Sequence, residues 1–174
     1  MINIKNISKE ERDSILKEAY DLAFKYEKEY GCCSQCVIAP ISKIFDLDLG
    51  ETFKSSYGLG AGIGLSSEGA CGALNAGVMI ISSLIGRSYD DFDKGRNDIC
   101  YKKSKELLVD FKEEFGSTMC GGVQTILMGS SFDLSIQEEL GAFNEAGGHS
   151  HKCPNVVGFV SQRIAKMILD GDLS

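Results

Sequence analysis

The N-terminal part of the chain alternates apolar and charged positions with the spacing of a helix. From about Lys9 to Tyr30, apolar residues recur every three or four positions, with Lys and Glu on the other face, which predicts an amphipathic helix. Ser8 and Glu11 match a capping box at its start, and Gly31 follows its end, where glycine commonly terminates helices. We interpret the charged face of this helix as a solvated surface.

A second, mostly apolar segment extends from the cysteines at 32–36 to about Phe45 and predicts another helix. Pro40 either kinks this helix or lies in its first turn, where proline costs least. A turn and a short helix at 52–57 then lead into the glycine-rich loop at 58–64. This loop does not match G-x-G-x-x-G and follows no strand, so we do not expect a dinucleotide site.

The segment from about Cys71 to Ile85 contains no charged residue, and we therefore expect it at the centre of the fold. The longest helical pattern follows at Phe92–Phe115, ended by Gly116. A short apolar segment, Val123–Met128, then precedes a polar, glycine-rich stretch that extends to residue 148. The last expected helix is Asn155–Leu169, with Pro154 in its first turn.

No segment shows a convincing alternation of apolar and polar residues, so no strand is expected. The patterning predicts an all-α fold: a single domain over residues 1–174, built as a bundle of four to five helices with the glycine-rich loop before its central helix. A chain of 174 residues is long enough to bury a substantial core without disulfides.

Charge and composition narrow the function classes. A net charge of −7 argues against nucleic acid, which requires a basic surface, and no apolar run is long enough for membrane insertion. The N-terminal residues 1–6 lead directly into charged sequence without an apolar signal region, so we expect a cytoplasmic protein. Seven cysteines in a reducing compartment favour metal or redox chemistry over a disulfide framework.

Four of the cysteines share a local pattern, because each lies at or just before an expected helix start. They are Cys33, Cys71, Cys120 and Cys153. The amides of a helix N-terminus favour a thiolate, and we expect the four sulfurs to gather at one end of the bundle. Their spacing matches neither a zinc ribbon nor a ferredoxin. For any one of these cysteines, simple core filling is the alternative interpretation.

The segments around these cysteines resemble a known family. The matching residues are Cys33-Ser34-Gln35, Gly69-Ala70-Cys71-Gly72-Ala73, Phe115-Gly116-Ser117 with Cys120, and Cys153-Pro154. They resemble the C_GCAxxG_C_C family of redox-active proteins over roughly residues 17–168. The sequence departs from the family pattern in one place, where Ala76 stands in place of a glycine and Gly77 follows it.

The resemblance implies that Cys33, Cys71, Cys120 and Cys153 form the site. A similar helical domain occurs in split-Soret cytochromes, where four cysteines resemble an iron–sulfur site, and this implies an iron–sulfur cluster of the 2Fe–2S type here. The sequence contains no C-x-x-C-H, so covalent haem is not implied.

The other candidate ligands have simpler interpretations. Cys32, Cys36 and Cys100 are read as core or surface thiols, although Cys33 and Cys36 have the C-x-x-C spacing of a redox dithiol. His149 and His151 precede Cys153 closely and could be metal ligands, but a glycine-flanked histidine pair is more often a solvated loop.

The leading hypothesis is a protein for electron transfer or redox sensing that holds an iron–sulfur cluster through the four family cysteines. The alternatives are a thiol–disulfide oxidoreductase that uses Cys33 with Cys36 or Cys71, and a helical module that holds structural zinc. The sequence does not decide whether the protein is an enzyme, and it does not identify the redox partner protein. The apolar helices are compatible with a homodimer.

Overall fold

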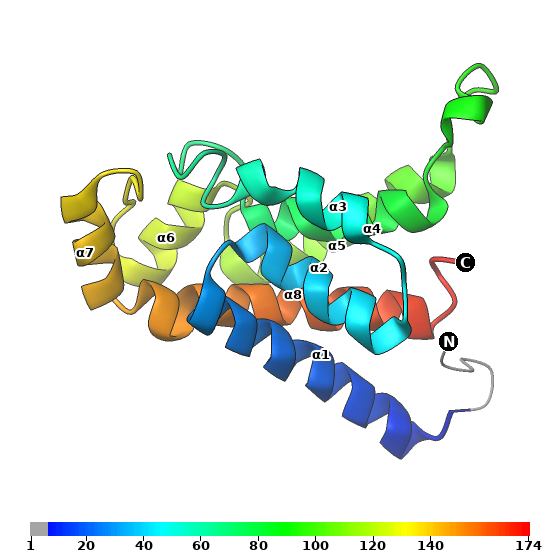
Figure 1. The fold of residues 1–174 in the computed structure, drawn as a ribbon, viewed down its shortest axis with the longest axis horizontal. Coiled ribbons are helices and arrows are strands. Elements are labelled where there is room, and N and C mark those ends of the chain that lie inside the picture. The colour runs from blue at the N-terminus through cyan, green and yellow to red at the C-terminus, as the bar shows by residue number, and fades with distance from the viewer. Residues whose placement is uncertain (1–6) are drawn as a thin grey trace.

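The computed structural model describes residues 7–174, and within them the fold is helical throughout (Figure 1). The α-helices are α1 (Lys9–Tyr30), α2 (Cys33–Phe45), α3 (Gly50–Ser55), α4 (Gly72–Ile85), α5 (Asp98–Phe115), α6 (Cys120–Met128), α7 (Gln137–Glu145) and α8 (Cys153–Leu169). Shorter helical turns are η2 (Tyr57–Leu59), η3 (Tyr89–Asp91) and the π-helical η4 (Gly148–Lys152). The only β-type pairing among the described residues is an isolated bridge between Ala70 and Met119.

The all-α prediction is confirmed, but the expected number of helices is wrong, because eight α-helices form within residues 7–174. Two of the additional helices, α3 and α6, correspond to the short segments expected at 52–57 and Val123–Met128, whereas α7 was not expected. Helices α3, α6 and α7 have only six to nine residues each, and such lengths give little periodic signal in a sequence. The expectation about an export signal rests on residues 1–6, which lie outside the described part of the chain.

The first two helices form as predicted. Ser8 Oγ accepts a hydrogen bond from the Glu11 N–H at 3.2 Å, while the Ser8 N–H donates to the Glu11 carboxylate at 2.8 Å, and Gly31 ends α1 with a positive φ. Helix α2 extends to Phe45. Pro40 lies in the middle of α2 and is buried there, so it is not a first-turn residue.

The start of α5 and the presence of α7 differ from the sequence prediction for identifiable reasons. Helix α5 begins at Asp98 and not at Phe92, because the Asn97 side chain caps it by accepting hydrogen bonds from two backbone N–H groups at 3.1 Å. Helix α7 lies inside the polar stretch that was expected to be irregular. Its one buried residue is Phe143, so it presents almost no apolar periodicity.

The central helix is α8 and not α4. Helix α8 packs against α1, α2, α4 and α5, and most of its residues are buried. Helix α4 buries Ile80 and Ile81, but Val78 and Leu84 on its other sides are only partly covered. An uncharged helix was expected to need burial on every side, but α4 packs against α2, α5 and α8 and leaves one side at the surface.

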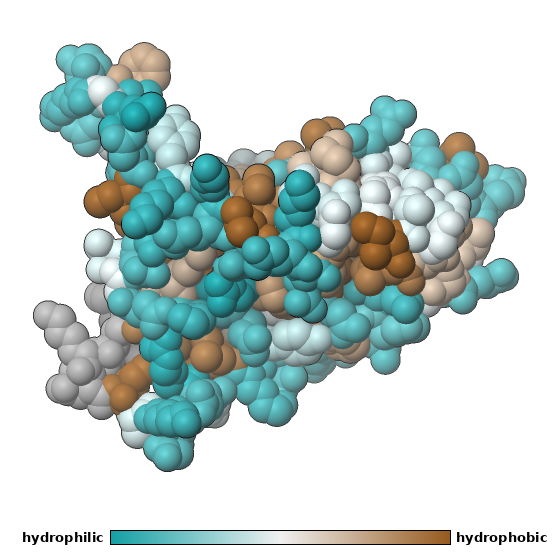
Figure 2. Space-filling model, turned by 180° about the vertical axis from the view of Figure 1, so that it is seen from behind, coloured by the Kyte–Doolittle hydropathy of each residue, from teal (hydrophilic) through white to brown (hydrophobic). Residues whose placement is uncertain are grey.

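The surface gives two further findings. None of the described helices is both long enough and apolar enough to cross a membrane. On the face opposite to that of Figure 1, apolar residues lie singly or in small groups among hydrophilic ones (Figure 2).

One end of the molecule collects the features that concern function. The α1–α2 connection, the glycine-rich loop and the N-termini of α6 and α8 all lie at the same end, together with α7 (Figure 1). Helix α4 also starts on the side facing this end. The opposite end contains the start of α1, the C-terminus and the projecting connection between α4 and α5.

Candidate functional site

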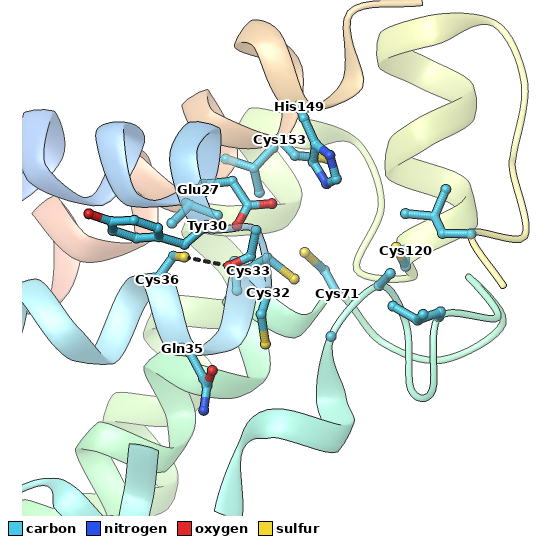
Figure 3. A pocket seen from close by; sticks show the side chains of 18 of the residues that line it. Glu27, Tyr30, Cys32, Cys33, Gln35, Cys36, Cys71, Cys120, His149 and Cys153 are labelled. Atoms are coloured by element: carbon cyan, nitrogen blue, oxygen red, sulfur yellow. Dashed lines mark hydrogen bonds between the residues drawn. The ribbon is translucent and has the colours of Figure 1, made fainter. Parts of the chain in front are cut away.

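A cavity of about 830 Å³ lies at this end of the fold. Its walls come from the end of α1, the start of α2, the glycine-rich loop, the starts of α4, α6 and α8, and α7 with η4. Most of its lining side chains are apolar. Six of the seven cysteines line it: Cys32, Cys33, Cys36, Cys71, Cys120 and Cys153 (Figure 3).

The expected position of the four family cysteines at helix starts is confirmed. Cys33, Cys120 and Cys153 are the first residues of α2, α6 and α8, and Cys71 is the N-cap of α4. These four helices converge on one cavity, and all four cysteines line it. Their assignment as ligands remains a prediction.

Glycine is required beside two of these cysteines because the chain approaches itself closely there. A Cβ at Gly72 would lie 2.6 Å from Cys33 Sγ and 2.7 Å from the Leu59 carbonyl oxygen. A Cβ at Gly62 would lie 2.7 Å from Cys120 Cβ. All three distances are shorter than a side chain can accept, so any larger residue would push the cysteine or the loop away.

The glycine-rich loop contains a left-handed segment at residues 61–65, whose φ values all lie between 46° and 72°. Ala61, Ile63 and Leu65 adopt this conformation without being glycine, at a cost of roughly 1–2 kcal/mol each. The bend brings the Ala61 N–H to the Cys33 sulfur. Strained backbone is often found at functional sites, and here it delivers a hydrogen-bond donor to a cavity thiol.

Burial determines the protonation of the four thiols. It raises the pKa of Cys33, Cys120 and Cys153, and it raises the pKa of Cys71 to about 12. The N–H groups of Ala73 and Leu74 favour the thiolate of Cys71, but less strongly than burial disfavours it. The expected thiolate at a helix N-terminus is therefore wrong for the metal-free cavity, because desolvation outweighs the helix amides.

Glu27 is a cavity residue that the sequence reasoning missed. It lies near the end of α1, only 3% of it is exposed, and its Oε2 has no hydrogen-bond partner within residues 7–174. Burial raises its pKa to about 8, although an interaction with Cys36 lowers it. The expectation that the charged residues of α1 are all solvated is wrong for Glu27. Its spacing from Ala19 and Ala23, which are also buried, was the available signal.

The three remaining cysteines divide into two groups. Cys32 and Cys36 line the cavity, and Cys36 Sγ lies 2.8 Å from the Gly31 carbonyl oxygen. Cys32 Sγ lies 3.8 Å from the Tyr57 carbonyl oxygen. Cys100 lies on α5, away from the cavity, with its sulfur 3.8 Å from Ser82 Oγ. All seven cysteines, which fall within the described residues, are free thiols.

The two histidines also separate. His149 lines the cavity with its ring edge-on to Phe143, 5.0 Å between ring centroids, and burial lowers its pKa. His151 is exposed, and its Nδ1 lies 2.8 Å from Ser150 Oγ. Only His149 is therefore available to a group held in the cavity.

The side chains that could bind a metal are distributed around the cavity and do not meet at one point. Within residues 7–174, no three His, Cys, Asp or Glu side chains lie close enough together to hold a single metal ion. A mononuclear zinc site needs four ligands at bonding distance from one ion. The arrangement therefore offers sulfur donors around a space and not a closed tetrahedral site.

The sequence matches one known protein family. A family model described as putative redox-active protein (C_GCAxxG_C_C) matches residues 31–167. The chain belongs to this family. The matched region includes all four helix-start cysteines of the C_GCAxxG_C_C pattern and ends close to the end of α8, whereas Glu27 lies just before it. No curated protein and no solved structure matches the chain significantly.

The departure from the C_GCAxxG_C_C pattern at residue 76 has a structural explanation. Ala76 is fully buried, and the close helix contact is made by the next residue, Gly77. A Cβ at Gly77 would lie 2.6 Å from Leu107 Cδ2 and 2.9 Å from Val160 Cγ1. Gly77 thus allows α5 and α8 to approach α4, so the substitution at 76 does not disturb the cysteine end of the helix.

Proposed function

We propose that this member of the C_GCAxxG_C_C family is a redox protein whose four helix-start cysteines bind an iron–sulfur cluster, of the 2Fe–2S type, for electron transfer or redox sensing. The ligands would be Cys33, Cys71, Cys120 and Cys153. The observation that carries the proposal is that four separate helix N-termini each present a cysteine to one cavity.

The donor set suits a cluster better than a single zinc ion. Four sulfur ligands are compatible with either zinc or iron–sulfur chemistry. However, the sulfurs line a cavity and do not converge on a single point. The bridging sulfides of a cluster extend the reach of its irons, so a cluster can join thiolates that one ion cannot.

The state of the thiols argues against a thiol–disulfide oxidoreductase. Such an enzyme attacks with a thiolate of lowered pKa, whereas burial raises the pKa of Cys33, Cys36 and Cys71. The Cys36 sulfur is also engaged with the Gly31 carbonyl oxygen. A bound cationic metal centre, in contrast, would itself deprotonate its thiol ligands.

The surrounding donors are placed to stabilise negatively charged sulfur. The N–H of Ala61 reaches Cys33, and the N–H groups at the start of α4 reach Cys71. Gln124 Nε2 donates to Cys120 Sγ at 3.6 Å. When bound, the cluster would supply one-electron chemistry, and these donors would set its reduction potential.

The test compares two cysteine variants purified without oxygen. Cys71→Ser should lose most of its iron and acid-labile sulfide, because a serine oxygen is a harder and poorer ligand. Cys100→Ser should keep both, since Cys100 lies outside the cavity. Iron and sulfide assays, together with the visible sulfur-to-iron absorption bands, give the measurement.

The other outcomes identify the alternatives. Equal and substantial iron in both variants would contradict the four-cysteine cluster. A colourless protein that contains stoichiometric zinc, lost only in Cys71→Ser, would replace the cluster by a zinc site. Metal-free protein whose disulfide exchange depends on Cys71 or Cys33 would indicate the dithiol enzyme.

A further inference from the structure

We propose that the cavity also binds a small organic cation, an amine with an apolar body, and that Glu27 is its anionic partner. This would make the site a binding site for an organic ligand as well as a place for redox chemistry. The inference does not depend on the cluster, because it rests on Glu27 and on the walls of the cavity.

The cavity is of the size that proteins use for organic ligands. Its volume of about 830 Å³ falls in the usual range for small-molecule sites, roughly 300–1,000 Å³. Such sites are mostly apolar and contain a few polar groups that orient the ligand. This cavity has that character, with Val123, Leu134, Val156 and Val157 among its apolar lining residues.

The carboxyl group of Glu27 has one unpaired oxygen in these apolar walls. Its carboxyl oxygen Oε2 is buried and makes no hydrogen bond to any described residue. Leaving such an oxygen unpaired carries a substantial cost, and buried polar atoms are nearly always paired. Figure 3 shows the carboxyl group directed toward the space around Cys33, Cys153 and His149. A ligand that donates a hydrogen bond there would remove this cost.

The charged groups around the cavity favour a cationic ligand over an anionic one. Among residues 7–174, no Lys or Arg lines the cavity, and Glu27 is its one carboxyl group. In the ligand-free protein Glu27 keeps its proton near neutral pH, because burial raises its pKa to about 8, and it would release this proton to solvent when a cation binds. An anion would find no positive partner, whereas a cation would meet Glu27. The net charge of −7 also attracts cations toward the protein.

Aromatic rings line the same cavity. Tyr26, Tyr30, Phe53 and Tyr57 all contribute to its walls. The Tyr26 and Tyr30 rings pack together with centroids 5.6 Å apart. Tyr30 and Tyr57 remain largely exposed, so they lie where the cavity meets solvent. Aromatic faces attract organic cations, so these rings would favour the entry of an amine into the cavity.

The test measures the charge preference of the cavity with three probes of similar shape. Phenethylamine is a cation near neutral pH, phenethyl alcohol is neutral and phenylacetate is an anion. Calorimetric titration of the full-length protein is done at about pH 8.5, above the raised pKa of Glu27 and where phenethylamine is still mostly a cation. The Kd for phenethylamine should be about tenfold or more below that of the alcohol, because hydrogen bonds between charged groups are stronger than neutral ones. Phenylacetate should not bind.

Two variants show whether Glu27 causes the preference. Glu27→Gln keeps the shape but cannot carry a negative charge, so phenethylamine and phenethyl alcohol should then bind with similar affinity. Glu29→Gln makes the same charge change at an exposed position of α1 and should keep the preference. Equal binding of amine and alcohol by the unmodified protein would overturn the proposal. So would an unchanged preference in Glu27→Gln, or no saturable amine binding up to about 10 mM. Iron content does not enter these readouts, so the cluster proposal can fail independently.

Discussion

Individual side chains in the cavity are governed by burial more than by their position in a helix. Cys71 is the N-cap of α4 and receives N–H donors, yet burial raises its pKa to about 12. Glu27 is a residue type that is almost never fully buried unless paired, and only 3% of it is exposed. Both residues therefore hold their protons near neutral pH in the metal-free protein, and this has consequences for stability.

Glu27 should make the iron-free protein less stable as the pH rises from about 5 to about 8. Burial raises its pKa from 4.5 to about 8, so in this range the unfolded chain loses a proton that the folded chain keeps. Stability then falls by up to about 1.4 kcal/mol per pH unit. Below the lower pKa the effect is absent, and above the higher one it is constant.

Urea unfolding at about pH 5 and about pH 8 measures this effect. It compares the unmodified protein with Glu27→Gln and Glu29→Gln. The unmodified protein and Glu29→Gln should lose roughly 2–4 kcal/mol more than Glu27→Gln between the two pH values. The same pH dependence in all three proteins would show that Glu27 titrates normally and would contradict its burial.

Single helices are positioned by close contacts that small residues permit. Gly77→Ala in α4 should lower the free energy of unfolding by roughly 1–2 kcal/mol, because the added methyl group would overlap with Leu107 and Val160. The β-branched Val160 has little rotamer freedom with which to move away. Chemical unfolding of the two proteins provides the measurement.

Gly141→Ala is the matched control for this change. Gly141 lies within α7, and a Cβ there would meet no atom within 4 Å. Alanine should therefore stabilise the protein by about 0.5–1 kcal/mol through its better helix propensity. Stabilisation by both substitutions would contradict the tight packing of α4 against α5 and α8.

At the scale of the whole molecule, one segment stands apart from the packed helices. The connection between α4 and α5, which contains η3, projects from the body (Figures 1 and 2). Tyr89 and Phe92 on it are largely exposed, and Arg87 stacks over the Phe92 ring at 4.7 Å. Its contacts are thus largely internal to the segment.

Limited trypsin digestion should cleave this connection first, after Lys94 or Arg96, because proteases attack exposed segments that can open locally. The two fragments should stay associated with helical circular dichroism unchanged, since α4 and α5 pack on each other and on α8. Mass spectrometry of the first products identifies the site. An initial cut within α1 at Lys17, which is exposed but helical, would contradict this order of stability.

The sequence by itself determined the helical class and most helix ends, because these depend on local signals. The capping box at Ser8, Gly31 after α1 and Gly116 after α5 act within one turn of the chain. The sequence also marked the four cysteines at helix starts. It could not reveal helix α7, whose single buried residue leaves no periodic pattern.

Only the tertiary structure decided which residues share the cavity and in what protonation state. Glu27 belongs to a charged helix by pattern, but α1 turns it toward the cavity, where water is excluded. Water is also excluded from Cys71 at the start of α4, so its thiol stays protonated and the thiolate expected there does not form. The physical reason is common to both residues. Desolvation depends on what the rest of the fold places around a group, and neighbouring residues in the chain do not specify that.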